Sequence, residues 1–110
     1  MILHIIRNQE WQLAKQSGSY KNKSLEEEGF AHCSNEDQVC KVANTLYKDE
    51  EDILLLYIDE KKLVSKIVYE DLYQLGEKYP HVYGPINLDV VVKTEPFLKD
   101  ENGAFHLKAY

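Results

Sequence analysis

The sequence is poor in the residues that redox, metal and nucleic-acid functions depend on. It has two cysteines, Cys33 and Cys40, whose spacing fits neither a CxxC redox pair nor a zinc knuckle, so we expect free thiols. Arg7 is the only arginine, and 19 acidic residues against 13 basic ones give a formal charge of −6. Phosphate neutralisation needs clustered Lys and Arg, so this balance argues against sequence-independent nucleic-acid binding.

Long apolar runs are also absent. No apolar stretch approaches the roughly 18 residues that a transmembrane helix needs, so we expect no membrane span. Residues 1–7 lack the long apolar region and the small-residue cleavage site of a signal peptide. These features predict a cytoplasmic protein that does not associate with a membrane.

What the sequence does contain suits one ordinary globular domain. Hydrophobic residues make up 44% and charged residues 29% of its 110 residues, both near globular averages. A chain of this length buries roughly 65% of the surface that it exposes when unfolded, enough for a core without metals or disulfides. We therefore expect residues 1–110 to form a single domain, acting as a monomer or a weak dimer.

Helical patterns gather in the first half of the chain. A strand over 2–7 precedes a helix that begins at Asn8 and ends at Gly18. The capping-box pattern at 24–27 predicts a short helical turn. Residues 36–48 form the clearest helix, because their apolar residues recur at helical spacing after an acidic first turn.

Strand patterns dominate the second half, and this order favours an α+β fold. The unbroken apolar run at 53–58 predicts a central strand covered on both faces. Two prolines and a glycine predict a shaped loop at 79–85. The other expected strands cover 30–33, 66–70, 88–95 and 104–109, the last two paired around Asn102-Gly103.

Three features carry the candidate chemistry: His4 in the first strand, the segment 29–34, and the 79–85 loop. Side chains alternate along a strand, so His32 and Ser34 share one face. Histidines on interior strands are costly without partners, and imidazole suits acid–base work or polar recognition near neutral pH. Together these features predict a functional site.

Plainer roles stay open for each of these residues. His4 is also explained as a structural histidine, Ser34 as the cap of the following helix, and Cys33 as a small core residue. Gly84 is suited to a backbone angle or a close approach that other residues forbid. A metal site built from three histidines is a further alternative, although the sequence contains no HxH or HxxxH pair.

Taken together, these motifs resemble a small bacterial family catalogued as domain of unknown function 952. The resemblance covers nearly the whole chain and rests above all on Glu28-Gly29-Phe30-Ala31-His32-Cys33-Ser34 and Pro80-His81-Val82-Tyr83-Gly84-Pro85, with His4-Ile5, Glu10-Trp11 and Tyr69-Glu70 as further markers. The family is distantly similar to the ADP-ribosyltransferase superfamily, in particular to its RNA 2′-phosphotransferase branch. The resemblance implies two split antiparallel sheets around an NAD-binding cleft.

The resemblance also implies roles for single residues. In that branch an early strand histidine and a later His-x-Ser bind NAD, which implies that His4 contacts a ribose and that the catalytic His32 shapes the nicotinamide pocket. The superfamily's cation-stabilising carboxylate has no unambiguous match, and Glu70 and His81 are both candidates. We assign it to Glu70, since a carboxylate stabilises a ribosyl cation better than an imidazole. The expected ligand-binding residues are His4, Ser34, His81, Tyr83 and Gly84.

The sequence therefore predicts an NAD-dependent transferase of ADP-ribosyl or 2′-phosphate groups, with NAD as substrate and no metal. One alternative is a non-catalytic domain that binds a nucleotide or an ADP-ribose-type ligand. A further alternative is a metal-dependent hydrolase that uses three histidines. The first two predict a small nucleotide-like molecule as the partner.

Overall fold

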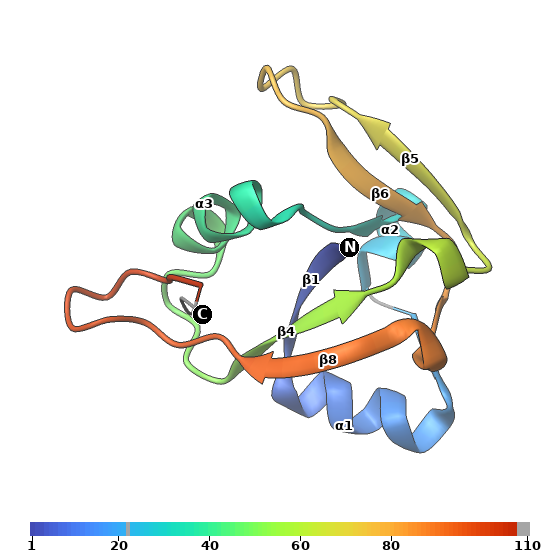
Figure 1. The fold of residues 1–110 in the computed structure, drawn as a ribbon, viewed down its shortest axis with the longest axis horizontal. Coiled ribbons are helices and arrows are strands. Elements are labelled where there is room, and N and C mark those ends of the chain that lie inside the picture. The colour runs from blue at the N-terminus through green and yellow to red at the C-terminus, as the bar shows by residue number, and fades with distance from the viewer. Residues whose placement is uncertain (22, 108–110) are drawn as a thin grey trace.

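Antiparallel pairing organises the chain, which the computed structural model describes over residues 1–21 and 23–107 (Figure 1). The first sheet has the order β1 (Ile2–Arg7), β4 (Ile53–Ile58), β8 (Val91–Pro96). The second pairs β2 (Ser19–Tyr20) with β7 (Ile86–Asn87), and the third has the order β3 (Ala31–His32), β6 (Tyr79–Tyr83), β5 (Lys66–Glu70). Short 3₁₀ turns cover Glu60–Lys62 and Leu88–Val90.

Helices lie in the first half of the chain, as the sequence predicts. Within the described residues they are α1 (Asn8–Ser17), α2 (Lys23–Glu28) and α3 (Glu36–Leu46). Gly18 ends α1 in the left-handed conformation, with φ of 85°. The α+β class with antiparallel sheets is thereby confirmed.

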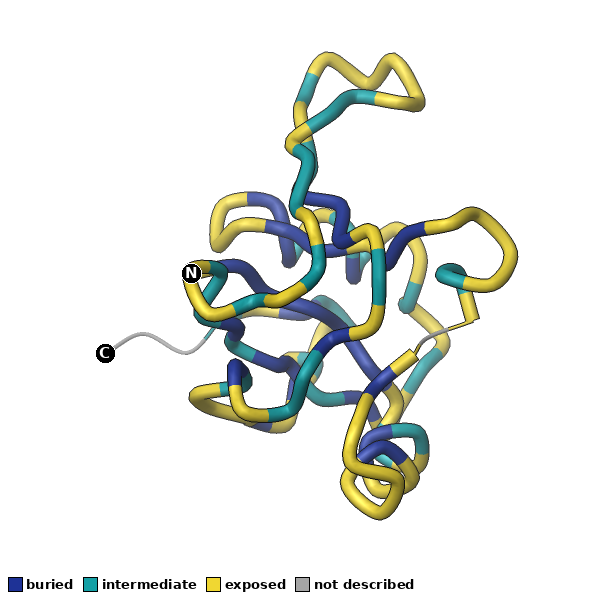
Figure 2. The backbone as a smooth tube through the Cα atoms, turned by 90° about the vertical axis from the view of Figure 1, so that its right-hand side faces the viewer, coloured by how far each residue is buried: buried dark blue, intermediate teal, exposed yellow. Residues whose placement is uncertain are grey.

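The central strand β4 is buried on both faces, which confirms the interpretation of its unbroken apolar run. Its even-numbered residues join Ile2 and Ile6 of β1 in a cluster that includes Trp11 of α1. Its odd-numbered residues join Leu3 of β1 in a second cluster that includes Val39 of α3. Figure 2 shows this buried centre inside an exposed periphery. The sheet therefore has α1 packed on one face and α3 on the other.

The start of α3 fixes how the first and third sheets meet. Its N-cap is Asn35, whose side chain accepts from the Gln38 backbone while the Gln38 side chain accepts from the Asn35 backbone. Ser34 is thus not the cap. Its backbone instead exchanges two hydrogen bonds with Leu3, of 2.7 and 2.8 Å. This bridge joins the end of β3 to the edge of β1.

The segment expected to be a loop contains a strand, and that prediction was wrong over Tyr79–Tyr83. This strand, β6, lies between β3 and β5, whose pairing supplies its hydrogen bonds. The Pro80 carbonyl accepts a hydrogen bond from the Cys33 amide, but Pro80 has no N–H to donate in return. The strand β3 ends one residue before Cys33, at His32. Gly84 follows with φ of 153°, and a Cβ there would overlap the Ser65 side chain.

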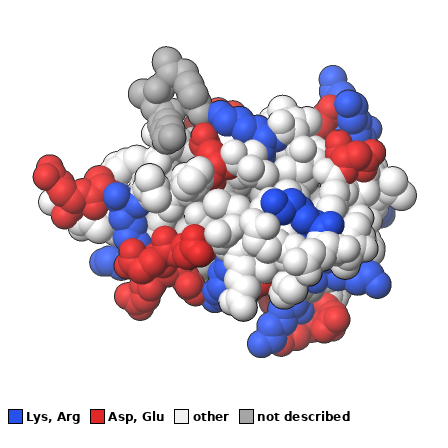
Figure 3. Space-filling model, turned by 90° about the horizontal axis from the view of Figure 1, so that it is seen from below, with Lys and Arg blue, Asp and Glu red and all other residues white. Residues whose placement is uncertain are grey.

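The outer surface carries mixed charge. On the face seen in Figure 3, acidic and basic side chains lie in small separate groups without one continuous basic area among the coloured atoms. None of the helices described is long and apolar enough to cross a membrane. At the C-terminal end, Lys99 and Phe105 form a single bridge around the turn at 100–104, and residues 108 and 109 of the expected hairpin lie outside the described residues.

Candidate functional site

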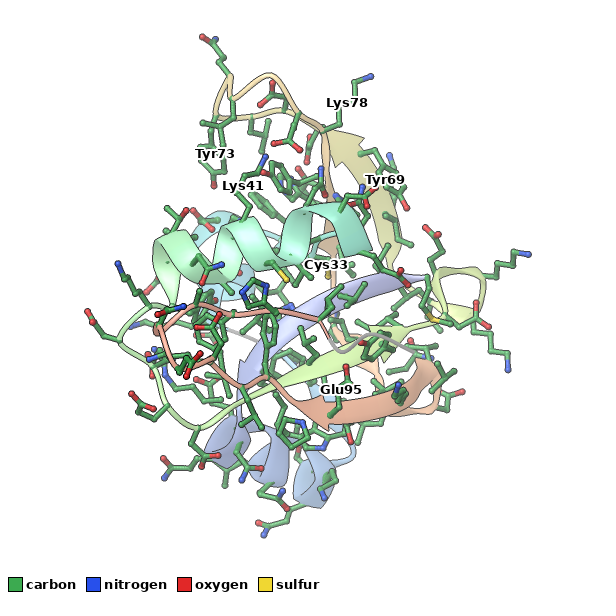
Figure 4. The ribbon with its side chains drawn as sticks, turned by 60° about the vertical axis from the view of Figure 1, so that its left-hand side comes forward. Cys33, Lys41, Tyr69, Tyr73, Lys78 and Glu95 are labelled. Atoms are coloured by element: carbon green, nitrogen blue, oxygen red, sulfur yellow. The ribbon has the colours of Figure 1, made fainter. Side chains whose placement is uncertain are left out.

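A cavity of about 710 Å³ lies between α3 and the third sheet. Residues from β1, the end of α2, β3, α3, the 71–78 connection and β6 line it. Figure 4 shows Tyr73 on the 71–78 connection and Lys41 on α3, near each other on one side of the molecule, with Cys33 next to the helix. A cavity of this size falls in the range of small-molecule binding sites.

Apolar side chains make up one part of the lining. Leu3 and Ile5 contribute from β1, and Val42 and Leu46 contribute from α3. Leu3 and Ile5 are buried, whereas Leu46 is exposed. A ligand in this cavity would therefore lie against an apolar surface with its polar groups toward the third sheet.

The third sheet places its polar residues on one face. His32 pairs directly with His81, so both rings lie on that face, with their centroids 5.4 Å apart. Ser34, two residues after His32, lines the same cavity. Cys33 is a buried core residue that also borders the cavity, and burial raises the pKa of its thiol to about 12. The thiol is thus protonated at neutral pH and unsuited to nucleophilic attack.

His81 is held from several sides although it is only 2% exposed. Its Nδ1 donates to the Glu70 carboxylate at 2.9 Å, and the Phe30 ring stacks on it at 4.2 Å. Among the described residues, no enclosed side-chain nitrogen or oxygen lacks a partner. Nε2 bonds to none of them, and His81 is one of the residues that line the cavity.

Glu70 bonds to His81 from outside the cavity lining. Its carboxylate accepts hydrogen bonds from the Tyr83 hydroxyl and from His81, and these bonds hold its pKa below the usual value. The same bond to Glu70 raises the pKa of Tyr83. Glu70, Tyr83 and Gly84 are not among the lining residues. A carboxylate in this position fixes which imidazole nitrogen carries the proton.

Glu28 is a cavity carboxylate that the sequence reasoning did not single out. It accepts from His32 Nε2 at 2.6 Å and from the Tyr73 hydroxyl at 3.2 Å. The bond to His32 is the main cause of the lowered pKa of Glu28. Tyr73 and His32 face each other with 19° between their ring planes. The sequence signal that could have pointed to Glu28 is its position four residues before His32, within the same motif.

A second carboxylate comes from the connection before β6. Glu77 is paired with Lys41 of α3, and this contact holds its pKa below the usual value. The Tyr79 hydroxyl also donates to Glu77, at 3.3 Å. Because Lys41 and Glu77 are 36 residues apart, no local pattern in the sequence indicates the pair.

His4 does not line the cavity. It is 3% exposed, its Nδ1 donates to the His32 carbonyl at 2.6 Å, and its Nε2 accepts from the Tyr20 hydroxyl at 2.9 Å. Burial lowers its pKa to about 4, so it is neutral at physiological pH. Both nitrogens are therefore occupied, and His4 supports the backbone of His32 from within the core.

A metal site of three histidines does not fit this arrangement. His32 and His81 lie side by side, but neither nitrogen of His4 is free to bind a metal. Over residues 1–21 and 23–107, no group of three His, Cys, Asp or Glu side chains is placed to hold a metal ion. The expected site residues that do meet at the cavity are His32, Ser34 and His81.

Known proteins match the chain at the level of family and fold. A family described as "Protein of unknown function (DUF952)" matches residues 5–94. The crystal structure of protein CC0527 from Caulobacter crescentus has a TM-score of 0.85 at 24% identity, covering 96% of this chain and 92% of that chain. Its solution NMR structure has a TM-score of 0.81 at 24% identity, over 94% and 89%. These structures show the same fold, and no curated protein matches.

Proposed function

The chain belongs to the DUF952 family, whose function is unknown, and we propose that its cavity binds a nucleotide of the NAD or ADP-ribose type. One observation carries the proposal. His32 and Ser34 of the first motif and His81 of the second converge on a cavity of about 710 Å³ with a partly apolar lining. Such a combination of apolar surface and a few convergent polar groups is typical of ligand sites.

The lining offers a complement to each part of a nucleoside. The nearly parallel rings of Tyr73 and His32 provide flat surfaces for a heterocycle. The Ser34 hydroxyl and His81 Nε2 provide a donor and an acceptor for ribose hydroxyls. The sequence motifs resemble those of the ADP-ribosyltransferase superfamily, and that resemblance implies the same ligand class.

Ribosyl transfer is the second candidate, and the carboxylate of Glu28 favours it. In such a reaction nicotinamide leaves with the electrons of its bond to the ribose, and an acceptor then attacks the cationic carbon. A carboxylate at the cavity stabilises that cation electrostatically, and Glu28 rather than Glu70 stands there. A 2′-phosphate fits less well, because Lys41, the lysine of the lining, is already paired with Glu77.

A titration of the purified chain with millimolar NAD or ADP-ribose tests the proposal. A ligand that binds only the folded state stabilises it, by about 2.7 kcal/mol at a ligand concentration of about 100 times Kd, and therefore raises the melting temperature. We expect this response in the wild type and its loss in His32→Ala. The matched control is His106→Ala, since His106 is exposed and pairs with Asp100. A wild type that responds to neither compound would contradict the proposal.

A further inference from the structure

The ionic side chains of the cavity are unequal in number. Glu28 and Glu77 contribute two carboxylates to the lining, whereas Lys41 contributes one ammonium group. The chain's arginine, Arg7, lies elsewhere and pairs with Glu50 and Glu10. A pyrophosphate inside the cavity would therefore meet more carboxylates than ammonium groups, which disfavours its own negative charge.

Aromatic rings stand beside these carboxylates. Tyr73, Tyr79 and Tyr47 line the cavity together with the His32 ring. The hydroxyls of Tyr73 and Tyr79 donate to Glu28 and Glu77, so each ring is fixed next to a negative charge. Aromatic faces attract cations, and clusters of them recognise quaternary ammonium groups.

From this juxtaposition we infer that the cavity selects a flat organic cation, such as an N-alkylated pyridinium ring, and leaves phosphates outside. The inference rests on the proposed function and specifies its ligand chemistry. The apolar side of the lining, from Leu3 to Leu46, disfavours a strongly hydrated ammonium ion. A ring with delocalised charge loses less hydration and stacks on Tyr73 or His32.

Three probes of one shape test the charge preference. They are 1-methylnicotinamide, a cation, nicotinamide, which is neutral, and nicotinate, an anion. Each is titrated into the whole chain and followed by ¹H–¹⁵N NMR. We expect the cation to bind about tenfold more tightly than nicotinamide, and nicotinate to bind most weakly.

Two matched variants locate the preference. Glu28→Gln removes the cavity carboxylate, and we expect it to abolish the roughly tenfold preference for the cation. Glu27→Gln removes the same charge one residue away, from a side chain that pairs with Lys23 and lies outside the lining. We expect this control variant to keep the preference for the cation. Both side chains are exposed, so both variants should melt within a few degrees of the wild type.

The outcomes separate this inference from the proposed function, which NAD and ADP-ribose test in parallel. Nicotinamide binding as tightly as 1-methylnicotinamide, or ADP-ribose binding while the cation does not, overturns the inference and leaves the proposed function standing. A preference that survives in Glu28→Gln also overturns the inference. Binding of the cation without binding of NAD or ADP-ribose supports the inference and overturns the proposed function. No binding of any probe overturns both.

Discussion

Two buried histidines, one in each three-stranded sheet, show how differently the sheets use a polar residue. His4 in β1 and His81 in β6 are exposed by only 3% and 2%. Both nitrogens of His4 are bonded within the protein, whereas His81 uses Nδ1 for Glu70 and leaves Nε2 without a partner among the described residues. Burial alone therefore does not mark a binding residue. We propose that unused hydrogen-bonding capacity in a residue that lines a cavity is the better marker.

The largest expected effect is on the His4 side of this comparison. His4→Ala removes the hydrogen bonds that His4 makes with the Tyr20 hydroxyl and with the His32 carbonyl, and it opens a space in the core. We expect a loss of about 3–5 kcal/mol in the free energy of unfolding. Urea denaturation measures it, and His32→Ala, which changes an exposed side chain, should lose less than about 1 kcal/mol. Equal losses in the two variants would break the comparison.

Acid should destabilise the protein through the same residue. The pKa of His4 is about 4 in the folded chain against 6.5 for an ordinary histidine, so the unfolded state binds more protons between these values. The stability from neutral His4 is complete above pH 6.5 and is lost as pH falls toward 4, about 3 kcal/mol in all.

The carboxylates give a separable signal. Glu28 and Glu70 have lowered pKa values, so their contribution is present above about 4.5 and is lost at still lower pH. Urea denaturation at about pH 7.5 and 5 measures the loss of stability above the range of the carboxylates, and NMR titration of the His4 ring checks that His4 causes it. A ring that titrates near its ordinary value would contradict this account.

The smallest expected effect is on nucleotide binding, when Glu70, the partner of His81, is replaced. We expect Glu70→Ala to weaken nucleotide binding about tenfold, because His81 then loses the partner that fixes its proton on Nδ1. Glu70→Gln should restore most of the affinity, since its side-chain carbonyl still accepts that proton. Ring ¹⁵N shifts of His81 report the tautomer without a ligand. The same tautomer in wild type and Glu70→Ala would show that Glu70 does not position His81.

Local patterns predicted much of the fold because local physics decides it. The strands at 2–7, 53–58 and 66–70 were predicted with the bounds that the structure has, since unbroken or alternating apolar residues leave few other ways to be buried. The helix predicted over 36–48 begins at Glu36 and ends two residues early, at Leu46. The end of α1 at Gly18 follows from the positive φ that glycine tolerates.

Non-local contacts account for what the sequence reasoning missed. Pro80 and Gly84 indicated a loop, but pairing with β3 and β5 supplies the bonds that make Tyr79–Tyr83 a strand. The strands β2 and β7 have two residues each and exist only because they meet. Elements this short carry no periodicity of their own.

The candidate site likewise combines features that a local pattern predicts with features that only distant contacts create. The sequence by itself determined that His32 and Ser34 share a face, because the pleat of a strand alternates its side chains. Only the tertiary structure decided that His81 joins them, through the register of β3 against β6, and that His4 is enclosed by Tyr20 and the His32 backbone. It also brought Glu28 and Tyr73 together across 45 residues. Which polar groups stay available to a ligand depends on such distant contacts, which no local pattern encodes.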